Sequence, residues 1–329
     1  MPNYWMITNR KRDDLGFEDE RDALTFWTSD GGDLGQLASW KQNTADSFKA
    51  ALIQAAGQFP LLTPSQNEDQ KHVNIFIHGY NNTWQASVAT YQEICSALFD
   101  GERSLGICVL FSWPSDGLYL GYYPDRIRAE ESAPDLSTIL NELYDWMLAQ
   151  QKAGIEDPSK RCRAKTSVIA HSMGDYLLQK AMAYTWTRKY QPLLVSLINQ
   201  LLMVAADVDN DLFKSGEAIE KSDGDAIANL TYRVTALFTG RDPVLGLSAG
   251  LKHFGKRRLG RSGLDLPVPA PDNVWEVDCS SLIPANSPDV HSAYFEAPET
   301  LELMRQVLRG VDRGVLASEG LAPQTPEAI

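Results

Sequence analysis

The sequence is poor in cysteine and lacks any long run of apolar residues. Its four cysteines show no paired spacing; they are Cys95, Cys108, Cys162 and Cys279. Disulfide frameworks and zinc sites need such spacing, so we expect reduced thiols, as in cytosolic proteins. No apolar run approaches the roughly 20 residues of a transmembrane helix, so we expect no transmembrane segment. The basic cluster at 10–12 follows a very short apolar stretch, which is the wrong order for a secretory signal, and we therefore expect a cytoplasmic location.

Positive charge is also scarce. Lys and Arg total 30 against 43 Asp and Glu, which gives a net charge of −13 and a pI of about 4.9. An acidic chain lacks the basic footprint of nucleic-acid binding, so we expect no nucleic-acid partner. Asp207, Asp209 and Asp211 alternate like the start of a calcium loop. However, Leu212 and Ala218 replace the glycine and glutamate that such a loop requires. We therefore expect no metal, and no cofactor is needed for the chemistry inferred below.

The order of predicted elements indicates an α/β fold. Strands alternate with helices, which predicts a mostly parallel central sheet covered by helices on both faces. We expect one domain over 1–313, with N-terminal edge strands and a helix in 1–70, and a flexible tail at 314–329. The predicted strands are 3–9, 24–28, 73–77, 107–111, 166–169, 202–206, 232–240 and 274–278, and helices are expected at 44–56, 84–99, 135–151 and 297–309.

Two segments are harder to assign. The charged stretch 10–22 is predicted to be a turn that joins the two edge strands, 3–9 and 24–28. The stretch 114–134 is rich in glycine and tyrosine and has no clear period. It has two interpretations: a segment that covers a pocket, or an irregular lead-in to the helix at 135–151.

One stretch carries most of the chemical information. An apolar, β-branched run that ends at Ile169 is followed by Ala-His-Ser-Met-Gly and then by an apolar stripe at helical spacing. A serine on such a tight turn needs small neighbours, and Ala170 and Gly174 are small. The stretch resembles the nucleophile elbow of α/β-hydrolases, with Ser172 as the nucleophile, although Ala170 replaces the usual glycine. The alternative is a chance Ser-x-Gly at a strand-to-helix turn.

A second motif follows the strand at 73–77. His78-Gly79-Tyr80 matches the α/β-hydrolase loop that supplies one oxyanion-hole N–H, here from Tyr80, and the N–H of Met173 would supply the second. Two N–H donors already oriented toward a tetrahedral oxyanion lower the reaction barrier substantially. The alternative is that Gly79 only permits a tight turn and that His78 is a packed structural histidine.

The remaining triad members follow from chain order. In α/β-hydrolases the order is serine, acid, histidine, and three of the five histidines precede Ser172. Of the other two, His291 follows the last predicted strand and is favoured as the base over His253. Asp242 follows the penultimate strand and is favoured as the acid, with Asp207, after the strand before that, as the alternative.

Further motifs occur in a fixed order along the chain. They are Phe-Ile-His-Gly-Tyr-Asn at 76–81, Phe-Ser-Trp-Pro-Ser at 111–115, Ala-His-Ser-Met-Gly at 170–174, Ala-Ala-Asp-Val-Asp at 205–209 and His-Ser at 291–292. Together they resemble a bacterial family of α/β-hydrolases described as predicted esterases or lipases of unknown function, over about residues 72–310. The resemblance implies a triad of Ser172, an aspartate and His291, and an oxyanion hole at Tyr80 and Met173. It implies no particular substrate.

The expected activity is hydrolysis of a carboxylic ester, from a small molecule or a lipid, through an acyl-enzyme on Ser172. The alternatives are a lipase or phospholipase, an amidase or thioesterase, and a non-catalytic relative that binds a ligand. Specificity is expected to reside in loops such as 114–134 and 244–272. A basic run within the second loop has two interpretations, a surface that steers anionic esters or phospholipids or, more commonly, a solvated loop; it comprises Lys252, Lys256, Arg257, Arg258 and Arg261.

Overall fold

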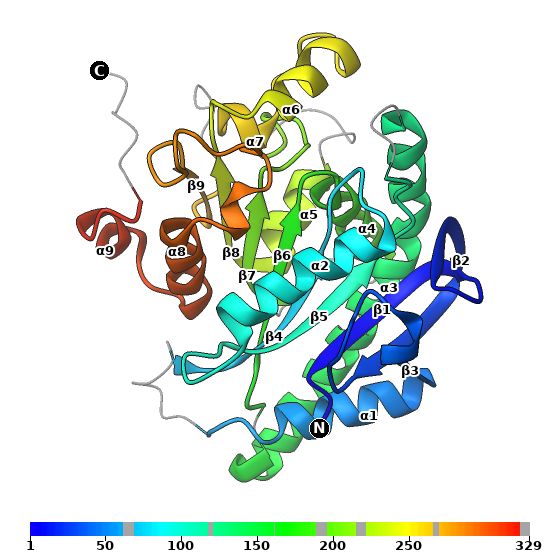
Figure 1. The fold of residues 1–329 in the computed structure, drawn as a ribbon. Coiled ribbons are helices and arrows are strands. Elements are labelled where there is room, and N and C mark those ends of the chain that lie inside the picture. The colour runs from blue at the N-terminus through cyan, green and yellow to red at the C-terminus, as the bar shows by residue number, and fades with distance from the viewer. Residues whose placement is uncertain are drawn as a thin grey trace.

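The computed structural model describes residues 1–61, 69–117, 121–160, 162–188, 196–214, 222–265 and 270–322. Within these residues the chain forms a nine-stranded sheet with the order β3-β2-β1-β5-β4-β6-β7-β8-β9 (Figure 1). The strands are β1 (Tyr4–Arg12), β2 (Phe17–Ser29), β3 (Lys41–Asn43), β4 (His72–Ile77), β5 (Gly106–Ser112), β6 (Lys165–His171), β7 (Ile198–Val204), β8 (Thr231–Phe238) and β9 (Val274–Asp278).

The sheet is mostly parallel. From β1 through β5, β4, β6, β7 and β8 to β9, every neighbouring pair runs in the same direction. Only β2 runs against its neighbours, β1 and β3. The central strand β4 is buried along its whole length, as the apolar run at 73–77 predicts for a strand covered on both faces. The predicted α/β-hydrolase fold is therefore confirmed.

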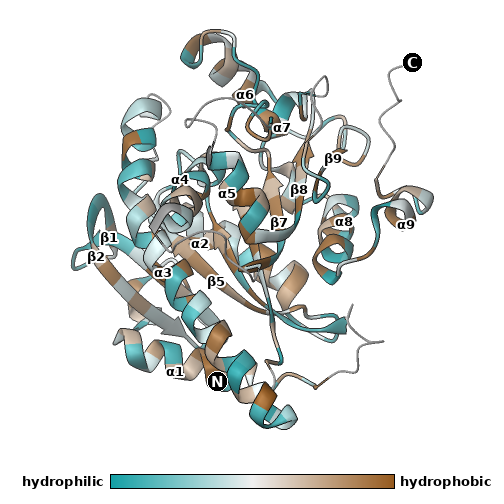
Figure 2. Cartoon of the chain, turned by 180° about the vertical axis from the view of Figure 1, so that it is seen from behind, coloured by the Kyte–Doolittle hydropathy of each residue, from teal (hydrophilic) through white to brown (hydrophobic). Residues whose placement is uncertain are grey.

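Helices cover both faces of the sheet. They are α1 (Ala45–Ala56), α2 (Trp84–Ile94), α3 (Tyr122–Glu156), α4 (Met173–Arg188), α5 (Ser222–Leu230), α6 (Pro243–Leu247), α7 (Leu259–Ser262), α8 (Pro298–Arg309) and α9 (Arg313–Ser318). One buried core joins the sheet to α1, α3, α4 and α5, and a second joins it to α2, α8 and α9. Figure 2 is turned by 180° from Figure 1 and shows the side of the sheet that carries α3, α4 and α5. None of the helices in the described ranges is long and apolar enough to cross a membrane.

The N-terminal part differs from its prediction. The two strands expected at 3–9 and 24–28 are longer and use most of the predicted turn at 10–22. Neither lies at an edge, because the short β3 covers β2 and β1 pairs with β5 inside the sheet. Several charged residues of the predicted turn lie instead on the exposed middle of β2.

Two further segments are more regular than expected. Residues 122–134 belong to the stretch expected to be either a pocket-covering segment or an irregular lead-in, and they form the first third of α3. Residues 118–120 lie outside the described part. Pro124 sits in the first helical turn, where its missing N–H costs nothing, and Pro134 is accommodated inside the helix. The predicted tail begins with α9, whose Leu316 is fully buried, and residues 323–329 lie outside the described part.

Candidate active site

The nucleophile elbow expected at Ser172 lies between β6 and α4. Ser172 has a φ of 56°, in the left-handed region that costs a residue with a side chain about 1–2 kcal/mol. Close packing accounts for the glycine two residues later. A Cβ on Gly174 would lie 2.6 Å from the carbonyl oxygen of His78 and 2.7 Å from that of Ile77. The turn therefore brings the serine against the loop that follows β4.

A hydrogen-bonded chain joins three of the predicted residues. His291 Nε2 lies 2.9 Å from Ser172 Oγ, and His291 Nδ1 lies 2.7 Å from Asp242 Oδ2. Because a carboxylate only accepts, Nδ1 carries the proton and donates it to Asp242, and Nε2 accepts from the serine hydroxyl. All three side chains are buried. Residues that are 119 and 49 positions apart in sequence thus form one polar chain at the carboxyl edge of the sheet.

Local structure holds both partners of Ser172. Asp242 caps the N-terminus of α6, where its Oδ1 accepts from the amide of Leu245 at 3.0 Å, so Oδ2 is left for the histidine. The carbonyl of His291 accepts from His171 Nε2 at 3.1 Å, and the amide of His291 donates to Asp289 at 3.0 Å. Burial acts to lower the pKa of His291, but the hydrogen bond and charge of Asp242 outweigh it, and the pKa is raised above 6.5.

The alternative acid, Asp207, has other partners. Its Oδ1 accepts from Arg258 Nε at 2.7 Å and from Ser248 Oγ at 2.8 Å, and its Oδ2 accepts from the hydroxyl of Tyr122 at 2.7 Å. Burial acts to raise the pKa of Asp207, but Arg258 and the two hydroxyls hold it below its usual value. Asp207 forms no hydrogen bond to His291 in the described part of the chain.

The loop predicted to form the oxyanion hole lies directly on the elbow. A Cβ on Gly79 would lie 2.8 Å from Ser172 Cβ, so only glycine lets this backbone approach so closely. Tyr80, whose amide is the expected donor, is the next residue along the chain. The side chain of Asn82 fixes the loop by donating to the carbonyls of Gly79 at 3.2 Å and Tyr80 at 2.9 Å. The second expected donor, Met173, is the first residue of α4.

His78 supports this loop as a neutral side chain. Its Nε2 accepts from the amide of Trp113 at 3.1 Å, its carbonyl accepts from the indole of Trp113 at 2.8 Å, and the two rings are stacked. Burial lowers the pKa of His78 to about 3, so its Nδ1 keeps the single ring proton and donates it to the carbonyl of Gly79. The packed structural role that the sequence left open therefore describes His78.

Sequence reasoning missed Arg10 as part of the site. Arg10 is almost fully buried, and burial lowers its pKa to about 10, at which it stays charged at neutral pH. Its guanidinium donates to the carbonyl of Asn82 at 2.8 Å, to the carbonyl of Ser115 at 3.1 Å and to Asp19 at 3.0 Å. It thereby ties the loop after β4 to the loop after β5. The signal was a cationic residue that continues an apolar strand, which we interpreted as the start of a turn.

No metal site accompanies this arrangement among the described residues, which contain no group of three or more His, Cys, Asp and Glu side chains able to hold an ion. The alternating aspartates after β7 serve another purpose, since Asp207 and Asp209 both bind Arg258.

Comparison with protein families identifies a relationship that agrees with this geometry. Residues 54–268, well over half of the chain, match the family described as "Alpha/beta hydrolase of unknown function (DUF900)". The chain belongs to this family. Among curated proteins, it is similar to the uncharacterised protein alr1448 of Nostoc sp. (strain PCC 7120), with 23% identity over 386 residues and 92% of each chain covered.

Similarity of this family member to solved structures is more distant. Phospholipase PlaB from Legionella pneumophila has 12% identity and a TM-score of 0.39, with 77% of this chain and 61% of that chain covered. An acetylxylan esterase has 12% identity and a TM-score of 0.33, with 73% of this chain and 99% of that chain covered. With TM-scores below 0.5, neither likeness carries an argument about the substrate of this chain.

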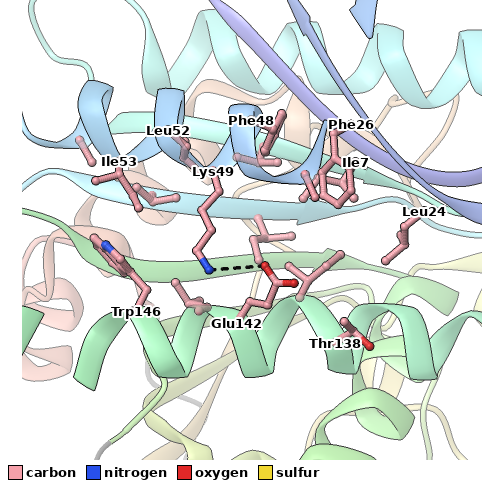
Figure 3. Close-up of a pocket in the computed structure, with 17 residues that line it drawn as sticks. Ile7, Leu24, Phe26, Phe48, Lys49, Leu52, Ile53, Thr138, Glu142 and Trp146 are labelled. Carbon is pink, nitrogen blue, oxygen red and sulfur yellow. Dashed lines mark ion pairs between the residues drawn. The ribbon is translucent and has the colours of Figure 1, made fainter. Parts of the chain in front are cut away.

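An apolar groove in this α/β-hydrolase lies apart from Ser172, Asp242 and His291. It runs between α1 and α3 over β1, β4 and β5, and Figure 3 shows its lining. Phe48 and Leu52 from α1 face Leu143 and Trp146 from α3, and a Lys49–Glu142 ion pair of 3.7 Å bridges the two helices. The lining contains none of the three residues of the hydrogen-bonded chain, Ser172, His291 and Asp242.

Proposed function

We propose that this chain is a serine hydrolase that cleaves carboxylic esters, with Ser172 as the nucleophile, His291 as the base and Asp242 as the acid that orients it. The single observation that carries the proposal is the hydrogen-bonded chain from Asp242 Oδ2 through His291 to Ser172 Oγ, at 2.7 and 2.9 Å. Serine alone is a poor nucleophile, and this arrangement is what activates it.

Acylation follows from the proton positions. Ser172 Oγ attacks the acyl carbonyl carbon while its proton passes to His291 Nε2. The resulting imidazolium is stabilised by Asp242, which already accepts the Nδ1 proton. Collapse of the tetrahedral intermediate breaks the bond to the leaving alcohol, which takes the proton back from Nε2. The acyl group then remains on Ser172 as an ester.

Deacylation repeats these steps with water in place of the alcohol. His291 removes a proton from the water, which attacks the acyl-enzyme, and the acid product leaves as Ser172 regains its proton. In both halves the oxyanion is stabilised by the amides of Tyr80 and Met173, and each such donor contributes about 3 kcal/mol. The close contact of Gly79 with Ser172 supports this assignment, because the loop that carries the Tyr80 amide lies against the serine.

Two alternatives from the sequence are weighed against this proposal. A non-catalytic binding protein has no need of a buried serine within 2.9 Å of a histidine whose pKa is raised by an aspartate, so the geometry favours an enzyme. Lipid esters are a narrower version of the same chemistry. They are favoured by the exposed apolar side chains of Leu251 and Phe254 on a segment that begins at Asp242.

Fluorophosphonate labelling tests the proposal directly. A fluorophosphonate reagent reacts with activated serines, so the intact mass should increase by one adduct that maps to Ser172 in the digested protein. Ser172→Ala should abolish labelling and ester hydrolysis while the protein stays folded by circular dichroism. Ser292→Ala, which changes the serine beside His291, is the matched control and should label like the wild type. Labelling of another serine, or full ester hydrolysis by Ser172→Ala, contradicts the assignment.

A further inference from the structure

One segment projects from the molecule at the edge of the sheet where the triad lies. It comprises α6, the π-helical turn Ser248–Lys252 that continues it, and residues 253–257, and it is the yellow protrusion above the body in Figure 1. Both of its ends are fixed at the site. It starts at Asp242, which binds His291, and it ends before Arg258, which binds Asp207.

Apolar side chains gather on this segment and beside it. Of the twelve exposed large hydrophobic side chains in the described part of the chain, five belong here: Tyr123, Ile127, Leu247, Leu251 and Phe254. We call these five residues the apolar rim. Phe254 is 95% exposed and Leu251 is 74% exposed. Phe254 also has a φ of 51°, which is strained for an aromatic residue.

Contacts join the two parts of the rim across the start of α3. The hydroxyl of Tyr123 donates to the carbonyl of Lys252 at 3.1 Å. The ammonium of Lys252 lies 3.9 Å from the ring centre of Tyr122 and 5.2 Å from that of Tyr80. Because Tyr80 belongs to the loop that lies on Ser172, Lys252 connects the rim to that loop.

Positive charge accompanies the rim in a chain whose net charge is −13. Of the basic run identified in the sequence, Arg258 is buried on Asp207, and Arg261 donates to the carbonyl of Asp242. Lys256 and Arg257 are exposed. Lys256 is paired with Asp209 at 3.0 Å, whereas Arg257 forms no ion pair with any described residue. Charges more than about 10 Å away are screened at moderate ionic strength, so the local cations decide what this surface attracts.

We propose that the apolar rim and its cations form a docking surface for an anionic lipid bilayer. Exposed aromatic and aliphatic side chains beside lysine and arginine are the combination that inserts into the headgroup region of such a bilayer. A protein partner of opposite charge is less favoured, because isolated side chains on a narrow protrusion offer little of the flat area that a stable protein interface buries.

The consequence for the substrate rests on the proposed function. With the rim inserted, the approach to Ser172 faces the bilayer, and an ester held in the membrane reaches the serine without crossing bulk water. The docking itself needs no catalysis, so binding and hydrolysis are separate measurements.

The test measures co-sedimentation of full-length Ser172→Ala protein with vesicles of phosphatidylglycerol and phosphatidylcholine, or of phosphatidylcholine alone. Using Ser172→Ala keeps lipid hydrolysis out of the measurement. The protein should bind the anionic vesicles, and the added change L251S/F254S should weaken binding at least about tenfold, since withdrawing even one large apolar side chain from water contributes about that factor. The matched control is L15S/I155S, which removes two side chains that are 83% and 84% exposed elsewhere, and it should bind like the parent.

A second pair of variants separates charge from apolar contact. Arg257→Gln should weaken binding to anionic vesicles about fivefold, as expected for one cation at such a surface, with no change on phosphatidylcholine alone. Lys152→Gln, an exposed cation at the far part of α3, should have no effect.

Three results would overturn the proposal. They are absence of binding to anionic vesicles, equal losses in the rim and control variants, and a wild-type dimer in light scattering that L251S/F254S converts to a monomer. The last result would assign the rim to contact between two copies. Failure of fluorophosphonate labelling would instead reject the serine hydrolase assignment and leave the docking surface intact.

Discussion

Replacing Asp242 with asparagine tests which of the two candidate acids serves His291, because it exchanges one carboxylate oxygen for an NH₂ group. The side chain keeps its shape, and its oxygen still accepts from the amide of Leu245 at the start of α6. The amide nitrogen therefore faces His291 Nδ1, 2.7 Å away in the native arrangement. An NH₂ group only donates, so Nδ1 must give up its proton and Nε2 must carry it. A protonated Nε2 cannot accept the proton of Ser172.

The expected loss is large because it concerns the tautomer of the base. The same change in an analogous triad lowers kcat about 10⁴-fold, which corresponds to about 5.4 kcal/mol in the barrier. Asp207→Asn should behave differently. Its partners are Arg258, Tyr122 and Ser248, so the main effect is a buried guanidinium that loses one of its two carboxylate partners and keeps Asp209. We expect a loss of about 3–5 kcal/mol in the free energy of unfolding, and a change in kcat of at most about tenfold for folded protein.

Both variants are compared with a short-chain nitrophenyl ester, at one pH and with the folded fraction measured by urea titration. The rate of fluorophosphonate labelling gives a second reading of the serine that does not depend on substrate binding. A larger loss of kcat in Asp207→Asn than in Asp242→Asn would refute the reasoning and transfer the role of acid to Asp207. Equal and small losses would show that neither carboxylate sets the tautomer of His291.

Three further predictions follow from the same geometry. The base must be neutral to act and its pKa is raised, so kcat/KM should fall as the pH drops, with a midpoint above 6.5; a midpoint near 4 would exclude His291. Gly174→Ala pushes a methyl group into the carbonyl of His78, so the free energy of unfolding, measured by heat or urea, should fall by about 1–3 kcal/mol and kcat should also fall. Gly240→Ala is the control, because open space surrounds Gly240, and it should be nearly neutral. Arg10→Met leaves the carbonyls of Asn82 and Ser115 without their donor, so the free energy of unfolding in urea titrations should fall by about 1–3 kcal/mol for each, and kcat should fall as well. Unchanged kinetics would show that Arg10 does not position the oxyanion loop.

The parts of the fold that the sequence predicted best are those where local pattern and tertiary burial agree. The last strand, at 274–278, and the helix at 297–309 are found within one residue of their expected bounds. Both have short, strong apolar patterns with clear turn residues around them. The order of serine, aspartate and histidine along the chain was equally informative, because each follows a separate strand and parallel strands end at one edge.

The parts that differed depend on distant contacts. The strand prediction stopped before Arg10, because nothing nearby in sequence indicates that the carbonyls of residues 82 and 115 will surround its guanidinium. Likewise, the stretch 114–134 showed no clear period, although residues 122–134 begin α3, which packs along α4. Contacts between residues so far apart in the chain cannot be predicted from the local pattern of a single sequence.

The packing of Arg10 under the oxyanion loop has a consequence for how this chain can be divided. The block that matches the family, residues 54–268, contains Ser172 and Asp242. It omits Arg10, which donates to the carbonyl of Asn82, and His291, which is hydrogen-bonded to Ser172. An expression fragment trimmed to that block would therefore carry the proposed nucleophile without its proposed proton acceptor. On the proposed mechanism, a minimal active unit runs from the first strand to beyond residue 291. Chimaeras between relatives should therefore be inactive unless the segments before residue 54 and after residue 268 come from the same parent.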